Sequence, residues 1–393
     1  MAEAYIVAAA RTATGKRNGA LSGWHPVDLA ATVIDALLDR SGADPALVDD
    51  LIMGCVSHVA EQSNDVARNA VLASRLPERV PGVAIDRQCG SSQQAVHFAA
   101  QAVMSGTQDV VIAAGIESMS RVPMFLPMSL PRKNGFGIYM SPNILKRYPQ
   151  TPEFSQFMGA ELLADKHGFS KEQLDTFALQ SHQRASAASK AGLFKDEIVA
   201  VEARTLEGGP TGAMHTADEG IRHDATLEGI ASVKLLQEGG KISAANASQI
   251  SDGAAGLMVV NERGLKAIGA KPLARIHQMT VMGDDPVVML EGPLPATLVS
   301  LKKAGLSIGD IGHFEVNEAF APVPLAWLKH TGADPARLNP LGGAIALGHP
   351  LGASGAKLMT TLVYALQRSG QRYGLQTMCE GGGMANVTII ERL

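Results

Sequence analysis

The chain has 393 residues, a formal net charge of −4 and 4% aromatic residues. This length exceeds a single ordinary core and predicts two or three domains. Charges of both signs are mixed along the sequence, without the basic runs that favour nucleic acid, and no apolar run reaches the length of a membrane span. The N-terminal residues lack the basic start and long apolar core of a signal peptide, so we expect a cytoplasmic protein.

The first third of the chain alternates predicted strands and helices. Strands are predicted at residues 5–10, 50–54, 80–85 and 109–115, and helices at 28–40, 63–73 and from about residue 90 onward. The run at 109–115 is almost continuously apolar, as a strand buried on both faces of a parallel sheet requires. Alternation of this kind predicts an α/β layered architecture.

The composition changes between residues 121 and 248. This stretch is rich in Met, Pro, Lys and His, with helices predicted at 154–166 and 171–191 and an irregular polar segment at 203–240. We interpret it as an inserted domain and a natural place for a binding lid. The strand predicted at 252–260 is again apolar, like the strands of the first third.

The last third of the chain repeats features of the first. Gly42 with the strand that follows it matches Gly305, and Gly106 with its following strand matches Gly370 at nearly the same separation. Two such matches predict duplication of one α/β unit. The expected divisions are an N-terminal half of residues 1–120 plus 249–270, an inserted loop domain of residues 121–248, and a C-terminal half of residues 271–393.

The repeat also predicts which loops meet. Cys89 aligns with Ala353, beside His349 in a glycine-rich loop, whereas Asn317 and Cys379 align with strand ends of the first half. In a pseudo-twofold pair of sheets, matching loops lie at one rim, where α/β sheets place their sites. We therefore expect these polar side chains to converge.

Cys89 stands where a predicted strand passes into a predicted helix. Unpaired backbone N–H groups and the positive end of the helix dipole point to that position. This environment predicts a lowered thiol pKa and a reactive thiolate. The alternative is a buried structural cysteine. Cys55 and Cys379 are far away in sequence and form no C-x-x-C pair with it, so neither a disulfide framework nor a zinc site is expected.

A cysteine nucleophile needs a base, and His349 is the best-placed candidate because glycines around it permit close approach of a substrate. Three glycines follow Cys379, and their N–H groups could line an oxyanion site. Asn317 could polarise a carbonyl or simply cap a helix. Ser354 and Lys357 spell the S-x-x-K of β-lactamases, but S-D-N and K-T-G partners are absent from the sequence.

Four motifs together resemble those of the thiolase family, in order and over nearly the whole chain. They are Cys89-Gly90-Ser91, Asn317-Glu318-Ala319-Phe320, Gly348-His349-Pro350 and Cys379-Glu380-Gly381-Gly382-Gly383. The resemblance implies a layered α-β-α-β-α fold. It also implies cleavage of a 3-oxoacyl-CoA by CoA to acetyl-CoA and a shortened acyl-CoA, or the reverse Claisen condensation. No metal or redox cofactor is implied, since CoA is a substrate.

The resemblance implies a role for each motif residue. Cys89 would attack the 3-oxo carbonyl, His349 would take its proton, and Cys379 would protonate the departing acetyl-CoA enolate. One oxyanion hole would combine His349 with a water held by Asn317, and the other would use the N–H groups of Cys89 and Gly381. Family members are dimers or tetramers, so we expect a homodimer or homotetramer.

The resemblance further implies contacts with the substrate. Ser248 is similar to a residue beside pantetheine, Arg222 to one near the adenosine, and Met289 to one at the acyl end of the pocket. Met158 and Phe320 belong to motifs that line the acyl pocket in the family.

Several residues depart from the usual family pattern. Phe157 stands where acetoacetyl-specific members usually carry His, and Gln93, Gln94, Glu380 and Asn386 alter the surroundings of the two cysteines. We therefore expect a degradative thiolase acting on a longer or bulkier 3-oxoacyl-CoA, with features that resemble thiolases of steroid or terpenoid side-chain breakdown. The alternatives are a biosynthetic thiolase specific for acetoacetyl-CoA and a non-catalytic acyl-CoA-binding protein.

Overall fold

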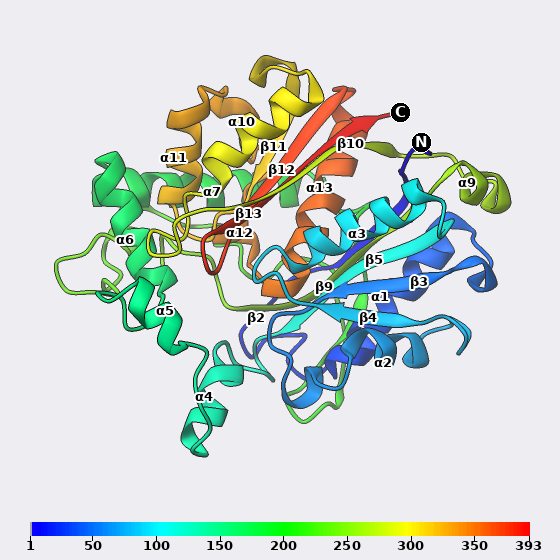
Figure 1. The fold of residues 1–393 in the computed structure, drawn as a ribbon, viewed down its shortest axis with the longest axis horizontal. Helices are drawn as coiled ribbons and strands as arrows, with labels where there is room; N and C mark the ends of the chain where they lie inside the picture. The colour runs from blue at the N-terminus through cyan, green and yellow to red at the C-terminus, as the bar shows by residue number, and fades with distance from the viewer. Residues whose placement is uncertain (1) are drawn as a thin grey trace.

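The computed structural model describes residues 2–393. Within that range an 11-stranded mixed sheet runs in the order β11-β12-β13-β10-β1-β9-β5-β3-β4, with β2 and β6 paired at its side (Figure 1). The strands of this sheet are β1 (Tyr5–Thr12), β2 (Gly15–Lys16), β3 (Asp50–Gly54), β4 (Gly82–Ile85), β5 (Val110–Ser118), β6 (Ile198–Val199), β9 (Ser251–Val260), β10 (Ala274–Gly283), β11 (Ile311–Val316), β12 (Tyr373–Glu380) and β13 (Met384–Arg392).

Helices cover both faces of the sheet. They are α1 (Pro26–Ser41), α2 (Val66–Ala73), α3 (Ser91–Ser105), α4 (Leu126–Lys133), α5 (Pro142–Arg147), α6 (Gln156–His167), α7 (Lys171–Lys190), α8 (Leu227–Ala231), α9 (Glu262–Ile268), α10 (Pro293–Ala304), α11 (Pro322–Thr331), α12 (Ala344–Leu347) and α13 (Ser354–Ser369). No helix in residues 2–393 is both long and apolar enough to cross a membrane.

The sheet contains the predicted duplication. Outward from the centre, β1-β9-β5-β3 on one side corresponds to β10-β13-β12-β11 on the other. The expectation of two separate sheets was wrong, because antiparallel pairing of β1 with β10, at Tyr5 with Arg275 and Ile6 with Ala274, joins the halves into one. The α/β class and the duplicated halves are confirmed.

The layers follow from the alternation of side chains along the strands. In β5, Val110, Ile112 and Ala114 pack in a cluster with α1 and α2, whereas Val111 and Ala113 pack with α3 and α13. On the C-terminal half, the face away from α13 packs against α10 and α11, together with α6 and α7 of the inserted segment. Helices α3 and α13 therefore form a shared central layer between the outer helices (Figure 1).

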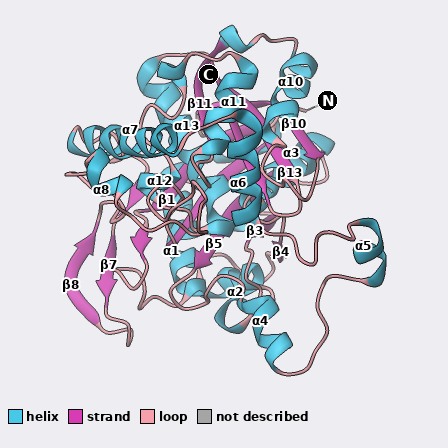
Figure 2. Cartoon of the chain, turned by 90° about the vertical axis from the view of Figure 1, so that its left-hand side faces the viewer, coloured by secondary structure: helices cyan, strands magenta, loops and turns pink. Residues whose placement is uncertain are grey.

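Predicted elements and observed elements differ mainly at their ends. Helix α2 begins at Val66 rather than residue 63 because Asp65 caps it. The segment predicted to be irregular, 203–240, contributes to a separate hairpin of β7 (Val201–Arg204) and β8 (Pro210–His215). Strand β8 is mostly exposed and contains proline and glycine, so it carries no strand signal. This hairpin and helices α4 and α5 lie at the periphery of the molecule (Figures 1 and 2).

A buried ion cluster fastens the inserted segment to the first strand. Arg11 of β1 donates through Nε to Glu197 and through Nη1 to Asp218, both at 2.7 Å, and all three side chains are at most 1% exposed. Burial alone would raise the pKa of Asp218, but the ion pair with Arg11 outweighs it and lowers that pKa to about 2. Because the charges are paired, removal of one partner leaves another buried without compensation.

We predict that Arg11→Met lowers the free energy of unfolding by roughly 3–5 kcal/mol, the usual cost of breaking a buried ion pair. The measurement is urea unfolding followed by circular dichroism. The matched control is Arg263→Met, which breaks the exposed pair with Asp109 and should cost less than about 1 kcal/mol. Equal effects of the two substitutions would contradict the role given to the buried cluster.

Candidate active site

The turn between β4 and α3 presents Cys89. Gln88 adopts a left-handed backbone with φ of 50°, and the hydroxyl of Ser91 accepts a hydrogen bond from the N–H of Arg87. This closed turn delivers Cys89 just before the first residue of α3, as the sequence predicts. Its side chain is only 8% exposed and packs among Met119, Leu351, Leu358 and Met378.

Burial governs the ionisation of Cys89. Desolvation and then the charge of Glu380 raise the pKa of the Cys89 thiol to about 12, although the N–H groups of Cys89 and Gly381 act in the opposite direction. The predicted low pKa was therefore wrong, because the apolar surroundings outweigh the helix N-terminus. Cys89 is a neutral thiol at neutral pH, and it needs a base to become a nucleophile.

His349 is oriented at both ring nitrogens. Nδ1 lies 2.5 Å from the hydroxyl of Ser354 and Nε2 lies 3.3 Å from Nδ2 of Asn317. Burial, followed by the positive charge of Lys357, lowers the pKa of His349 to about 3. The imidazole is consequently neutral at neutral pH, and Nε2, which faces the amide Nδ2 of Asn317, carries the lone pair that can take a proton.

The other predicted catalytic residues gather around the same point. Asn317 follows β11, its N–H donates to the carbonyl of Thr377, and its Oδ1 is buried without a hydrogen-bond partner among the described residues. Cys379 near the end of β12 is fully buried, and burial and then the charge of Cys89 raise its pKa well above the usual value. The backbone N–H of Gly381 lowers the pKa of the Cys89 thiol, as does the N–H of Cys89 itself.

A cavity of about 520 Å³ opens beside this cluster. Its wall includes His349, Ser248, Arg222 and Phe320, so the structure brings the catalytic histidine together with three predicted substrate contacts. Leu351 lines the cavity and also belongs to the apolar cluster that contains Cys89, so the nucleophile lies behind this part of the wall. Its lining contains Arg222, Lys16 and Arg17 and no acidic residue, which suits a ligand that carries phosphates.

Two predicted substrate contacts lie elsewhere. Met158 is 45% exposed and lines a neighbouring hollow of about 680 Å³, which shares Phe157 and Leu236 with the cavity. Met289 is 4% exposed, has a positive φ and packs into the core of the C-terminal half. No pattern in the sequence indicates this turn, and Met289 is not among the residues that line the cavity.

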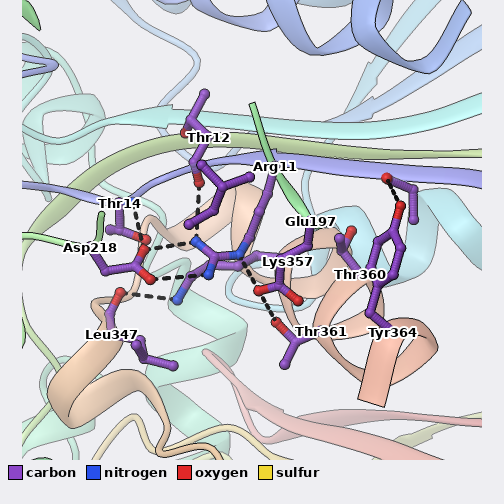
Figure 3. A network of polar contacts seen from close by, with 12 residues as sticks. Arg11, Thr12, Thr14, Glu197, Asp218, Leu347, Lys357, Thr360, Thr361 and Tyr364 are labelled. Atoms are coloured by element: carbon purple, nitrogen blue, oxygen red, sulfur yellow. Dashed lines mark hydrogen bonds and ion pairs between the residues drawn. The ribbon is translucent and has the colours of Figure 1, made fainter. Parts of the chain in front are cut away.

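Sequence reasoning missed the support behind the histidine loop. The ammonium of Lys357 on α13 donates at 3.0 Å to the carbonyls of Leu347 and Gly348, directly before His349 (Figure 3). Lys357 is buried beside the cluster of Arg11 and Asp218 (Figure 3), and its positive charge also acts on His349. The only sequence signal was the S-x-x-K pattern, in which Ser354 and Lys357 are the two residues that hold His349.

The comparisons with known proteins agree with this geometry. The chain matches the models of the thiolase N-terminal domain over residues 4–263 and of the thiolase C-terminal domain over residues 270–392. It is 54% identical to the steroid 3-ketoacyl-CoA thiolase FadA6 of Mycobacterium tuberculosis, with 100% of this chain and 95% of that protein covered. It is 41% identical to an acetyl-CoA acetyltransferase of Chromobacterium violaceum over 99% of this chain and 100% of that protein.

A solved structure extends the comparison to the fold. The crystal structure of human mitochondrial 3-ketoacyl-CoA thiolase superposes with a TM-score of 0.89 at 36% identity, covering 100% of this chain and 99% of that chain. Matches of this extent leave no segment of the fold unaccounted for. The chain therefore belongs to the thiolase family and is an acyltransferase that cleaves 3-ketoacyl-CoA.

Proposed function

We propose that this thiolase works through an acyl-thioester on Cys89, with His349 as base and Cys379 as acid. The observation that carries the proposal is a buried neutral imidazole, fixed by Ser354 and Asn317, and a buried neutral thiol on two loops that share Leu351 as a neighbour. A thiol with a raised pKa is inert until a nearby base removes its proton.

The proposed first half-reaction cleaves the carbon–carbon bond. As Cys89 sulfur attacks the 3-oxo carbonyl carbon, its proton passes to His349 Nε2, and collapse of the tetrahedral intermediate breaks the C2–C3 bond. The electron pair leaves with acetyl-CoA as an enolate, which takes the thiol proton of Cys379 at C2. The acyl group stays on Cys89 as a thioester.

The proposed second half-reaction transfers the acyl group to CoA. His349 first passes the proton it took from Cys89 to the Cys379 thiolate, then takes the proton of the incoming CoA thiol as that sulfur attacks the thioester carbonyl, and finally gives this proton to Cys89, which departs as the thiol. His349 and a water held by Asn317 stabilise one oxyanion, while the N–H groups of Cys89 and Gly381 stabilise the other. Fixed donors of this kind commonly contribute several kcal/mol to acyl transfer.

The proposed substrate is a 3-oxoacyl-CoA with a bulky acyl group, and the physiological direction is degradative. Phe157 lines the cavity, and its ring packs edge-on against that of Phe320 with the ring centroids 5.8 Å apart. The two rings give the wall a broad apolar surface. The name of the mycobacterial relative, a steroid thiolase, supports a ring-derived acyl group. We further propose that Ser248 and Arg222 hold CoA, and that the protein is a cytoplasmic homodimer or homotetramer.

We predict that intact mass spectrometry detects an acyl adduct on Cys89 after mixing with a 3-oxoacyl-CoA and no free CoA. Cys89→Ala should give no adduct. Cys379→Ala should form the adduct from 3-oxoacyl-CoA at least about 100-fold more slowly, because the enolate lacks its acid. The same variant should still be acylated by a simple acyl-CoA, which requires no carbon–carbon cleavage. Thiolysis by Cys89→Ala would refute the proposed mechanism and leave acyl-CoA binding as the role of that cysteine.

We predict that Lys357→Met lowers kcat by up to about 100-fold, because the loop before His349 loses its anchor. Lys357 lowers the pKa of His349, so its removal raises that pKa and the base becomes protonated at higher pH. The acidic limb of the kcat/KM profile should therefore move upward. Lys357→Arg keeps the positive charge, so its acidic limb should lie at the same pH as that of the unmodified enzyme. A purely structural role for Lys357 would reduce kcat without moving it.

We predict that a long or ring-bearing 3-oxoacyl-CoA has a higher kcat/KM than acetoacetyl-CoA. Phe157→His should lower the value for the bulky substrate by roughly tenfold, the usual worth of an apolar contact, with little change for acetoacetyl-CoA. Phe125→His is the matched control, since Phe125 contacts Phe157 but lies outside the cavity. A preference for acetoacetyl-CoA would instead support the biosynthetic alternative.

A further inference from the structure

Glu380 differs from the other buried acids of the chain. Its residue is 0% exposed, yet neither carboxyl oxygen is in hydrogen-bonding geometry with a donor of residues 2–393. By contrast, Glu117 accepts hydrogen bonds from three backbone N–H groups and Gln62, and Glu318 accepts from Ser181, Asn339 and Ile345. A buried carboxylate without partners is costly, so its presence calls for an explanation.

The carboxyl of Glu380 lies directly behind the turn that carries Cys89. Side chains alternate along β12, so Glu380 faces the same way as Met378, which packs on Cys89. A Cβ added to Gly90 would lie 1.8 Å from Oε1 of Glu380. The acid therefore rests against the residue that follows the nucleophile.

A polar layer surrounds Glu380 between α3 and the strands β12 and β13. Asn386 donates to Oε1 of Gln94 at 3.3 Å, and deeper in the layer Gln93 and His97 both contact the hydroxyl of Thr388 at 2.7 Å. The remaining side-chain acceptor atoms of Gln93 and Asn386 are buried without partners among the described residues. The layer can therefore accommodate a polar carboxyl without an ion pair.

Few charges act on Glu380. The guanidinium of Arg87 favours its carboxylate, and so does the nearby backbone N–H of Asn386, although that N–H lies outside hydrogen-bonding geometry. The facing groups that lose protons are the thiols of Cys89 and Cys379, and each has its pKa raised by Glu380. His97 of α3 shares the layer and stays neutral because burial lowers its pKa to about 3, and β13 offers only Met384 and Asn386 near this end.

Burial raises the pKa of Glu380 to about 8, which leaves the carboxyl protonated at neutral pH and ionised above it. Two adjacent buried groups cannot both carry negative charge without a large electrostatic penalty. Ionisation of Glu380 and of Cys89 must therefore oppose each other.

We propose that Glu380 is a positioning residue that acts through Cys89: its neutral form permits the thiol to lose a proton, and its charged form opposes that loss. The inference rests on the proposed role of Cys89 as nucleophile. The Cys89 proton passes to His349, whereas the proton of Glu380 leaves to solvent only at alkaline pH. The isosteric Gln keeps the neutral shape and removes the switch.

The test is the rate at which iodoacetamide alkylates Cys89 in the free enzyme between pH 6 and 10, with the site assigned by peptide mass mapping. Glu380→Gln and the unmodified enzyme should react at similar rates near pH 6.5, where Glu380 is neutral. At pH 9.5 the variant should react roughly three- to tenfold faster, which corresponds to a coupling of about half to one pKa unit. Superimposable profiles over the whole range would overturn the proposal.

Two further variants serve as a control and as a substitute for Glu380→Gln. Glu391→Gln removes one carboxylate at the far end of β13, where Glu391 pairs with Arg275 and Arg372, and its profile should match that of the unmodified enzyme. If Glu380→Gln does not fold, Arg87→Gln tests the same point, because loss of the guanidinium raises the pKa of Glu380. The pH at which ionisation of Glu380 begins to flatten the rise of the alkylation rate should then be higher, and an unchanged onset of the flattening would count against the proposal.

Alkylation separates this inference from the proposed catalytic mechanism. Thiolysis by a Cys89→Ala variant would refute the mechanism, whereas the alkylation profiles would still decide whether Glu380 controls the thiol.

Discussion

The contact between the first turns of α3 and α13 is the constraint on which the site depends. A Cβ at Gly355 would lie 2.1 Å from the backbone nitrogen of Gln93, and the N–H of Ala356 donates to the hydroxyl of Ser92 at 2.8 Å. Only glycine permits this approach at residue 355. Because Cys89 precedes α3 and the His349 loop precedes α13, helices that touch at these ends bring the two loops together.

The electrostatics of the site keep Cys89 and His349 uncharged in the free enzyme and so keep the thiol unreactive. Burial holds Cys89 as a thiol with a pKa near 12 and His349 as a neutral ring with a pKa near 3. Proton transfer from one to the other is therefore unfavourable in the free enzyme. It becomes favourable only when attack on a bound carbonyl creates an oxyanion beside fixed donors. Such a site avoids a free thiolate that would react with unrelated electrophiles.

Much of this architecture could be predicted from the sequence, since strand–helix alternation and the glycine repeat are local patterns. The pairing of β1 with β10 could not, because two residues of register at the centre leave no sequence signature. The ionisation of Cys89 was misjudged for a related reason. The helix start that lowers a thiol pKa is visible in sequence, whereas the methionines and leucines that desolvate the thiol come from three distant segments.

The roles of Ser354 and Lys357 also depend on contacts in space that the sequence does not show. Their spacing matched an unrelated hydrolase motif, and the missing partners of that motif removed them from consideration. In the fold, one helical turn places the serine hydroxyl against Nδ1 of His349 and the lysine against the carbonyls before it. A pattern that fails one functional reading can still hold residues that support another, and only contacts in space distinguish the two.

The residues that depart from the family pattern lie next to one another in the fold. Gln93 and Gln94 are far in sequence from Glu380 and Asn386, but all four share one layer between α3 and the end of the sheet. A single polar side chain in an apolar core would cost about 1–3 kcal/mol, whereas several can share partners. Each substitution is therefore tolerable mainly in the presence of the others. The layer lies behind Cys89 rather than in the cavity wall, so it influences the nucleophile and leaves acyl selection to Phe157 and its neighbours.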